Sequence, residues 1–266
     1  MLPNFLGIGA QRAATTWLFE CLREHPEIYL PPQKEIHFFD ENFDKGLEWY
    51  ESFFNAVTTE KAIGEITPNY YHLPHALQRI KEVLPEVKLI LSLRHPLERA
   101  YSAYKLLHEY YADKGVSFEE AFKEGSYLLD LSLYSKHLEN IFKLFPRSQV
   151  HIIIYDDILS DPLQVLRKLY SFLGVSIDFV PQAAFARYNR IIFPRFQNFI
   201  ISLKLGFLLD LIKKTPLASL IKKLHAQFFY SHPKSSYSVD SHVRKLLLDD
   251  IQKLKSLIKP DLPWVL

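Results

Sequence analysis

The segment GIGAQRAATTWL, residues 7–18, has the residue types of an anion-binding loop. A short apolar run ends in a glycine turn, and helical spacing begins at Thr15. The start of a helix offers free backbone N–H groups and a partial positive charge, which together bind phosphate-like anions. Arg12 adds a forked cation, and Thr15 and Thr16 add hydroxyls in the first helical turn. The alternative interpretation is an ordinary strand-to-helix turn capped by threonine.

This loop lacks the parts of a nucleoside triphosphatase loop. Such a loop reads G-x-x-x-x-G-K-[ST], whereas here Ala14 replaces the second glycine and no lysine precedes Thr15. A metal-dependent phosphotransferase would also need an acidic ligand for magnesium near the loop. Glu65, at the end of a predicted strand, is the only candidate for that ligand. The residues therefore favour a diphosphate-like or phosphosulfate group that is bound without a metal.

A second segment, LSLRHPLERAYSAY (91–104), places Arg94 at the carboxyl end of an apolar strand. Pro96 ends the extended run, and Ser102 follows about two turns into the next helix. Ligands of open α/β sheets bind beyond the carboxyl ends of the strands, so Arg94 and Ser102 could converge on a second phosphate. Arg99, in the same helix, could instead pair with an acid. The alternative for Arg94 is a helix cap or a structural ion pair.

A third segment, PPQKEIHFFD (31–40), groups Lys34, Glu35, His37 and Asp40 with two aromatic residues. A carboxylate beside an anion site is costly unless it has a task. Glu35 is therefore the candidate general base that takes a proton from an attacking hydroxyl. His37 is either a second base or a hydrogen-bonded structural histidine. No His/Cys constellation with metal-ligand spacing is visible, and we expect no metal site.

The elements that must position these residues alternate between strands and helices. Near-continuous apolar runs at 5–9, 61–66, 88–93 and 150–155 are typical of strands covered on both faces. Helical spacing follows the first strand and recurs in the later segments 74–84, 97–112, 134–145 and 161–174. The pattern predicts an α/β fold with a largely parallel sheet. We expect a single domain over residues 1–266, in which 176–241 form a helical region that borders the substrate.

Composition excludes several classes of protein. The 266 residues carry 32 basic and 30 acidic side chains, so bulk attraction to nucleic acid is not expected and any anion site must be local. The single cysteine, Cys21, excludes an internal disulfide and favours a reducing compartment. Neither a secretory leader nor an apolar run of about 18 residues is present. We therefore expect a cytoplasmic protein without a membrane span.

In this order, the three segments resemble the sulfotransferases that use 3'-phosphoadenosine 5'-phosphosulfate (PAPS), and look most like the bacterial and heparan-sulfate-type branch. GAQRAATTWL resembles that family's 5'-phosphosulfate loop. RHPLERAYSAY matches its 3'-phosphate motif R-x-P-x-x-R-x-x-S-x-Y, and KEIHFFD is similar to the segment around the catalytic glutamate. GEITPNYY (64–71) resembles the stretch that follows. The resemblance covers residues 5–175 and 242–265, and it implies a P-loop-like three-layer fold with a central sheet flanked by helices.

The resemblance also implies a role for each matching residue. Those matching the 5'-phosphosulfate site are Arg12, Ala13, Ala14, Thr15 and Thr16. Arg94 and Ser102 match the 3'-phosphate site, and Glu35 matches the general base, with Lys34 and His37 beside it. The reaction implied is transfer of a sulfuryl group from PAPS to an acceptor hydroxyl or amine, with no metal required and 3'-phosphoadenosine 5'-phosphate (PAP) as the product.

Three positions depart from the family pattern. Arg12 stands in place of the loop lysine, Ala14 in place of a loop glycine, and Ile66 where heparan-type enzymes often carry a lysine beside the acceptor. Two alternatives stay open. One is a catalytically weak protein of the same fold that binds a nucleotide, and the other is the metal-dependent phosphotransferase. We expect a carbohydrate or small-molecule alcohol as acceptor, and the sequence predicts no particular oligomeric state.

Overall fold

The computed structural model describes residues 1–107, 115–186, 239–258 and 262–266. Contacts divide the chain into one unit, Met1–Ala186 with Ser238–Leu266, and a second, Arg187–Tyr237. Most of the region 176–241, predicted to be helical and to border the substrate, lies outside the described residues. All the predicted site residues belong to the first unit.

A five-stranded parallel sheet with the order β2-β3-β1-β4-β5 forms the centre of the first unit. Its strands are β1 (Phe5–Gly9), β2 (Ile28–Tyr29), β3 (Ala62–Ile66), β4 (Lys88–Leu93) and β5 (Val150–Ile154). Four of them are the predicted apolar runs, and every residue of β1 and β3 is buried, as expected for strands covered on both faces. The edge strand β2 was missed because two residues carry no periodic signal.

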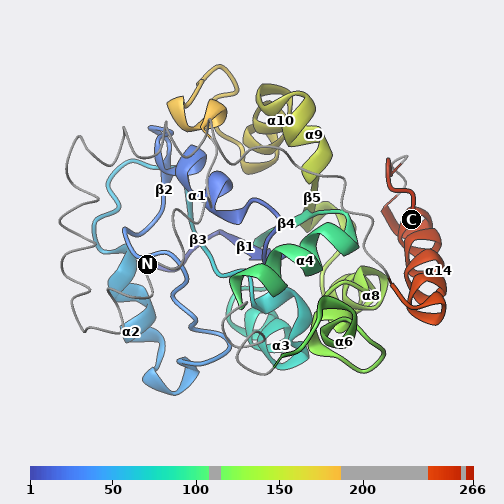
Figure 1. Cartoon of the computed structure of the whole chain (residues 1–266). Helices are drawn as coiled ribbons and strands as arrows, with labels where there is room; N and C mark the ends of the chain where they lie inside the picture. The colour runs from blue at the N-terminus through green and yellow to red at the C-terminus, as the bar shows by residue number, and fades with distance from the viewer. Residues whose placement is uncertain (108–114, 187–238, 259–261) are drawn as a thin grey trace, which may run out of the picture. The chain divides into compact units, whose positions relative to one another are not determined.

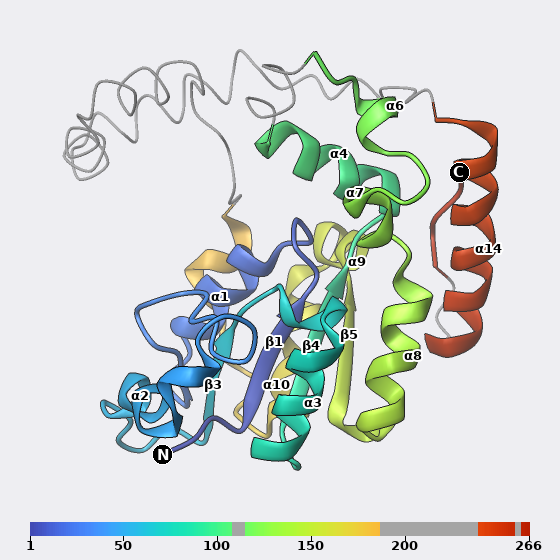
Figure 2. The same cartoon turned by 90° about the horizontal axis from the view of Figure 1, so that it is seen from below.

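Helices cover both faces of this sheet (Figure 1). On one face, α3 (Pro74–Val83), α8 (Tyr134–Leu144) and α14 (Ser241–Ile258) share an apolar core with the strands. On the other face lie α1 (Thr15–Arg23) and α10 (Pro162–Leu173), and Figure 2 shows the strands from the side on which α3 lies. The predicted three-layer α/β fold is therefore confirmed.

The other described helices are shorter or lie away from the sheet faces named above. They are α2 (Leu47–Glu51), α4 (Pro96–Leu106), α6 (Phe118–Ala121), α7 (Tyr127–Asp130) and α9 (Tyr155–Ser160). The described 3-10 turns are η1 (Phe43–Lys45), η2 (Ser52–Phe54), η3 (Tyr70–His72), η4 (Arg147–Gln149) and η5 (Gln182–Phe185).

Helix boundaries follow local signals where these are strong. The Asp161 side chain caps α10 by accepting from the Gln164 N–H at 2.9 Å, and the helix ends at Gly174 in the left-handed conformation. The fourth predicted strand was one residue too long, because Tyr155 begins α9 instead of ending β5. The helix predicted over 97–112 is α4, and residues 108–114 lie outside the described part.

Parallel pairing brings the carboxyl ends of β1, β3 and β4 to one edge of the sheet. The loop after β1 is tied to β4 by the Ala10 N–H, which donates to the Ser92 carbonyl at 2.7 Å. Gly9, the last residue of β1, must be glycine because a Cβ there would lie 2.5 Å from the Tyr71 ring. This close approach lets the first loop leave the sheet beside the segment that follows β3.

A buried carboxylate anchors the end of β3. Glu65 is 1% exposed and accepts hydrogen bonds from the hydroxyls of Tyr50 (3.1 Å), Tyr70 (2.9 Å) and Thr67 (2.6 Å). Burial raises the pKa of Glu65, and these hydrogen bonds oppose that rise. The Thr67 hydroxyl also accepts from the His37 N–H at 3.4 Å, so the network reaches the loop that carries the acid–base candidates.

We expect Glu65→Leu to lower the free energy of unfolding by about 3 kcal/mol, because buried hydroxyls would lose their acceptor. Glu65→Gln keeps the shape and one acceptor oxygen, so its loss should be clearly smaller. Urea denaturation followed by circular dichroism measures both changes. A Glu65→Leu variant as stable as the unmodified protein would show that the carboxylate is not an anchor.

Candidate active site

The first predicted segment forms an open helix start. Thr15 and Thr16 are the first two residues of α1, as predicted, and the residue before them, Ala14, has no side chain that could cap the helix. Threonine capping, the alternative interpretation of this turn, is therefore wrong. Ala14 and Arg12 both adopt left-handed backbone conformations, with φ of 67° and 69°. A glycine at position 14 would adopt this conformation without strain, which accounts for the family's glycine there.

Arg12 and Ser102 meet across the site, although they are far apart in the sequence. The Arg12 Nε donates to the Ser102 Oγ at 3.1 Å. Burial, followed by the charges of Arg94 and Arg99, lowers the pKa of Arg12. Among the described residues no carboxylate pairs with Arg12. The structure thus brings the first two segments together around a positive charge that lacks a counter-ion.

Arg94 has a partner, but an exposed one. Its guanidinium donates to the Glu98 carboxylate from Nε at 3.1 Å and from Nη2 at 3.0 Å, and it stacks 4.7 Å from the centre of the Tyr155 ring. The alternative of a structural ion pair is therefore realised in part. Half of the Glu98 side chain is exposed, and exposed pairs of this kind contribute little energy. An incoming anion could compete for Arg94 at low cost.

Arg99 pairs with no acid among the residues that the structure describes, contrary to the suggestion from the sequence. It is fully buried and donates to the Ser132 hydroxyl from Nε (3.1 Å) and Nη2 (2.8 Å), and to the Leu128 carbonyl from Nη2. Its Nη1 is buried without a hydrogen-bond partner. The acceptors that the described residues offer to this cation are all neutral, so its charge adds to the positive potential felt by Arg12.

Lys105 is a member of this cationic group that the sequence argument missed. Partial desolvation and then the charges of Arg94 and Arg12 lower its pKa. The available signal was helical spacing, because Lys105 follows Ser102 by three residues in α4 and such residues lie on the same face. The charge therefore extends beyond the residues that match the family motifs.

The third segment lies at the end of β3, where the Glu35 N–H donates to the Ile66 carbonyl at 3.2 Å. Glu35 contacts the Lys34 ammonium through Oε1, and its Oε2 lies 3.9 Å from His37 Nε2. The other imidazole nitrogen, Nδ1, lies 2.9 Å from Asp40 Oδ2. The Glu35 side chain is 40% exposed, so it remains accessible to an acceptor.

The charges around His37 control its protonation. Burial alone would lower the pKa of His37, but the hydrogen bond to Asp40 and the charges of Asp40, Glu41 and Glu35 outweigh it and raise the pKa. His37 and Glu35 both have positive φ, 57° and 64°. Such conformations are costly for residues with a Cβ and cluster at functional sites. This loop is thus held in a particular shape around its acid–base groups.

The two halves of the site are joined by side-chain amides. Gln11, in the first loop, donates to Asn69, which in turn donates to Asp40. Neither amide was predicted from the sequence, because Gln11 and Asn69 are 58 residues apart and Asn69 and Asp40 are 29 residues apart. Ile66 is fully buried, and a Cβ on Gly7 would lie only 2.8 Å from its side chain.

Two features concern metal binding. Glu65, the candidate magnesium ligand of the phosphotransferase alternative, has both oxygens engaged by hydroxyls and anchors β3 instead. His37, Asp40 and Glu41 each bring one possible ligand atom to within 4.8 Å of the others. This grouping was not predicted from the sequence. Within it, His37 Nδ1 and Asp40 Oδ2 already contact each other.

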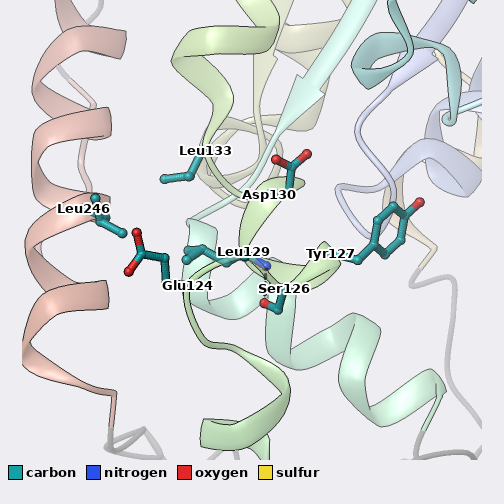
Figure 3. Close-up of a pocket in the computed structure, with 8 residues that line it drawn as sticks. Glu124, Ser126, Tyr127, Leu129, Asp130, Leu133 and Leu246 are labelled. Atoms are coloured by element: carbon teal, nitrogen blue, oxygen red, sulfur yellow. Dashed lines mark hydrogen bonds between the residues drawn. The ribbon is translucent and has the colours of Figure 1, made fainter.

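A pocket of about 460 Å³ lies apart from these residues, beside α7 and α14. Figure 3 shows Glu124 and Leu129 directed toward Leu246 of α14, whereas the Tyr127 ring points the opposite way. Two carboxylates, Glu124 and Asp130, line the pocket, and Glu124 pairs with His242 at 3.1 Å. None of the anion-binding candidates lines it, so the pocket is distinct from the site described above.

Known proteins resemble this chain in sequence and in fold. Residues 2–200 match the family described as the sulfotransferase domain. The mouse "Bifunctional heparan sulfate N-deacetylase/N-sulfotransferase 4" is 34% identical over 69% of this chain and 24% of that protein. The Dictyostelium discoideum "Membrane-associated sulfotransferase kil1" is 28% identical over 67% of this chain and 57% of that protein. The chain thus spans just over half of the second relative and about a quarter of the first.

A solved structure shows the same likeness over almost its full length. The sulfotransferase from Alicyclobacillus acidocaldarius superposes with a TM-score of 0.61 at 28% identity, covering 87% of this chain and 97% of that chain. Within the residues described, no helix combines the length and apolar character needed to cross a membrane. The domain match spans most of the chain, and the segments that carry the likeness converge on one site, so this chain belongs to the sulfotransferase family.

Proposed function

We propose that this domain transfers a sulfuryl group from PAPS to a hydroxyl or amine of an acceptor by in-line displacement. The observation that carries the proposal is a positive charge at the start of α1 that no carboxylate among the described residues compensates. There Arg12 contacts Ser102 and lies within the field of Arg94 and Arg99, next to a loop that presents Glu35. A donor with phosphate and sulfate groups supplies the missing negative charge.

The donor residues divide between two anionic groups. Arg12, Thr15, Thr16 and the backbone at Ala13 and Ala14 would bind the 5'-phosphosulfate at the helix start. A separate group, Arg94 with Ser102, would bind the 3'-phosphate. The family likeness supports this division, and the hydrogen bond from Arg12 to Ser102 joins one residue of each group. It explains why Arg94 keeps only an exposed acidic partner, since that partner can give way to the 3'-phosphate.

Glu35 is the proposed general base. As the acceptor oxygen or nitrogen bonds to sulfur, the bond from sulfur to the 5'-phosphate oxygen breaks and PAP leaves. The acceptor's proton passes to Glu35, while Arg12 and the helix start stabilise the charge that develops on the leaving phosphate. His37, between Asp40 and Glu35, adjusts the charge next to the base. PAPS carries its own activation, so no step in this proposal requires a metal.

The acceptor class is the coarsest part of the proposal. Glycan acceptors are supported by the relatives whose names refer to heparan sulfate, and a small-molecule alcohol is the second candidate. Ile66 is buried, so the described part of β3 places no lysine beside Glu35. A single domain over residues 1–266 and a cytoplasmic location are part of the proposal, the latter supported by the single, buried Cys21.

We expect Glu35→Gln to lower kcat at least about 100-fold, because the acceptor would lose its proton acceptor, while PAP affinity stays within about twofold because Glu35 does not contact the donor phosphates. Transfer from PAPS to heparan-type oligosaccharides and small alcohols gives kcat, and calorimetry gives the affinity. Glu48→Gln, an exposed site on α2, is the matched control. Normal turnover by Glu35→Gln would exclude Glu35 as the base.

For Arg94→Ala we expect a loss of about 30-fold in affinity for PAP, as for other charge-assisted hydrogen bonds. Affinity for adenosine 5'-monophosphate, which lacks the 3'-phosphate, should hardly change. Arg167→Ala, an exposed position on α10, is the control for lost surface charge. Equal losses for both nucleotides would remove Arg94 from the 3'-phosphate site.

For Lys105→Met we expect PAP binding about threefold weaker at low salt, with a difference that shrinks as salt screens the charge. The control, Lys123→Met, removes an exposed lysine that the cationic group does not include. Affinities at two salt concentrations measure the effect. If Lys105→Met and Lys123→Met behave alike, Lys105 does not belong to the anion site.

A further inference from the structure

A continuous chain of hydrogen bonds links the donor loop to the acid–base loop. Gln11 Nε2 donates to Asn69 Oδ1 at 3.1 Å, and Asn69 Nδ2 donates to Asp40 Oδ2 at 2.7 Å. The same carboxylate oxygen lies 2.9 Å from His37 Nδ1. Asn69 stands between β3 and η3, where the ends of β1 and β3 come together. Of the side chains in this hydrogen-bonded series, Asn69 is the one that contacts both the donor loop, through Gln11, and the acid–base loop, through Asp40.

The chemistry of these groups fixes their orientation. An ionised carboxylate only accepts hydrogen bonds, so Asp40 requires the NH₂ group of Asn69 and leaves its oxygen for Gln11. By the same argument His37 donates from Nδ1, which turns Nε2 toward Glu35 at 3.9 Å. The Asp40 side chain is only 3% exposed. A buried carboxylate is costly unless donors surround it, and Asn69 is one of these donors.

We infer that Asn69 is a positioning residue of the site, which ties the donor loop to the Asp40–His37 pair and shares the negative charge of Asp40. In this role Asn69 does not touch the reacting atoms. It keeps Asp40 from attracting a proton to His37 too strongly, and so limits the positive charge that His37 adds beside Glu35, which already contacts the Lys34 ammonium. The catalytic consequence rests on the proposed function, whereas the link between the loops does not.

Removing Asn69 should change the protonation of His37 in a defined direction. Without the amide donor, Asp40 keeps its remaining contact with the Glu41 N–H at 2.9 Å and its contact with His37. The negative charge of Asp40 then interacts more strongly with His37, which favours the protonated imidazole. The described groups that face His37 are Asp40, Glu41 and Glu35, all acidic, with Lys34 held on Glu35. The pKa of His37 should therefore rise above its already raised value.

The first test is an NMR titration of the His37 ring in the full chain, with its signal assigned from a His37→Gln variant. In Asn69→Leu, which keeps the side-chain size, we expect the pKa of His37 to rise by about 0.5 units or more, as for loss of a donor to a carboxylate. Asn140→Leu, on α8, should leave it unchanged. An unchanged or lowered pKa in Asn69→Leu would overturn the inference.

If Asn69→Leu does not fold, Asn69→Ala decides the same point. It removes the amide donor from Asp40 without adding a second carboxylate that would share a proton with Asp40, so the pKa of His37 should again rise. A pKa equal to that of the unmodified protein would refute a role for Asn69 in the charge of this pair. Neither titration depends on turnover, so both distinguish failure of the inference from failure of the proposed function.

The second test is a double-mutant cycle on PAP affinity. Gln11→Ala should weaken PAP binding, and in the Asn69→Leu background its effect should be about threefold smaller, as for two partners in one hydrogen bond. Effects that simply multiply would show that Asn69 does not connect the loops. Absence of PAP binding in every variant and in the unmodified protein would refute the proposed function, and the His37 titration would still test the inference.

Discussion

The site depends on the positive charge of Arg12 and Arg99, which no carboxylate in the described part of the chain matches. Arg99 is fully buried against neutral acceptors, and Arg12 lies within its field and that of Arg94. Buried or crowded cations are costly unless an anion compensates them. Parallel pairing of β1 with β4 places the first loop beside Ser102 of α4 and so holds these cations close together. The positive charge therefore lies where the phosphate groups of a donor would compensate it.

The buried carboxylate of the site, unlike its buried arginine, has donors around it. Glu65 is buried but surrounded by hydroxyl donors, and it holds the end of β3. From there Thr67 and the Ile66 carbonyl hold the backbone of the loop that presents Glu35 and His37. A neutral amide, Asn69, separates the cationic and acidic halves and bonds toward both. Fixed groups of opposite charge can therefore act on one substrate without neutralising each other.

Local sequence signals predicted the parts of the site that depend on a single strand and its following helix. The glycine turn before Thr15 and the Arg94–Pro96 sequence placed both segments correctly, because a parallel sheet gathers the carboxyl ends of its strands. The hydrogen bond from Arg12 to Ser102 was not predicted, because the family likeness assigns these two residues to different anionic groups of the donor.

Other features depend on tertiary contacts and could not be read from spacing. Asn69 gains its role from partners in two distant segments, and the neutral partners of Arg99 lie in the later stretch around α7. The two-residue strand β2 has no pattern of its own. The left-handed backbone conformation of Ala14 could not be predicted from its residue type, because alanine usually avoids that conformation.

The central claim is that the charge at the start of α1 binds a 3',5'-bisphosphorylated adenosine without a metal. The most direct measurement is calorimetric titration of the purified protein with PAP in the presence of EDTA, with ATP and Mg²⁺ titrated in parallel. The account predicts micromolar binding of PAP without metal and much weaker binding of ATP. Binding of ATP only with Mg²⁺, and none of PAP, would contradict it and favour a metal-dependent phosphotransferase.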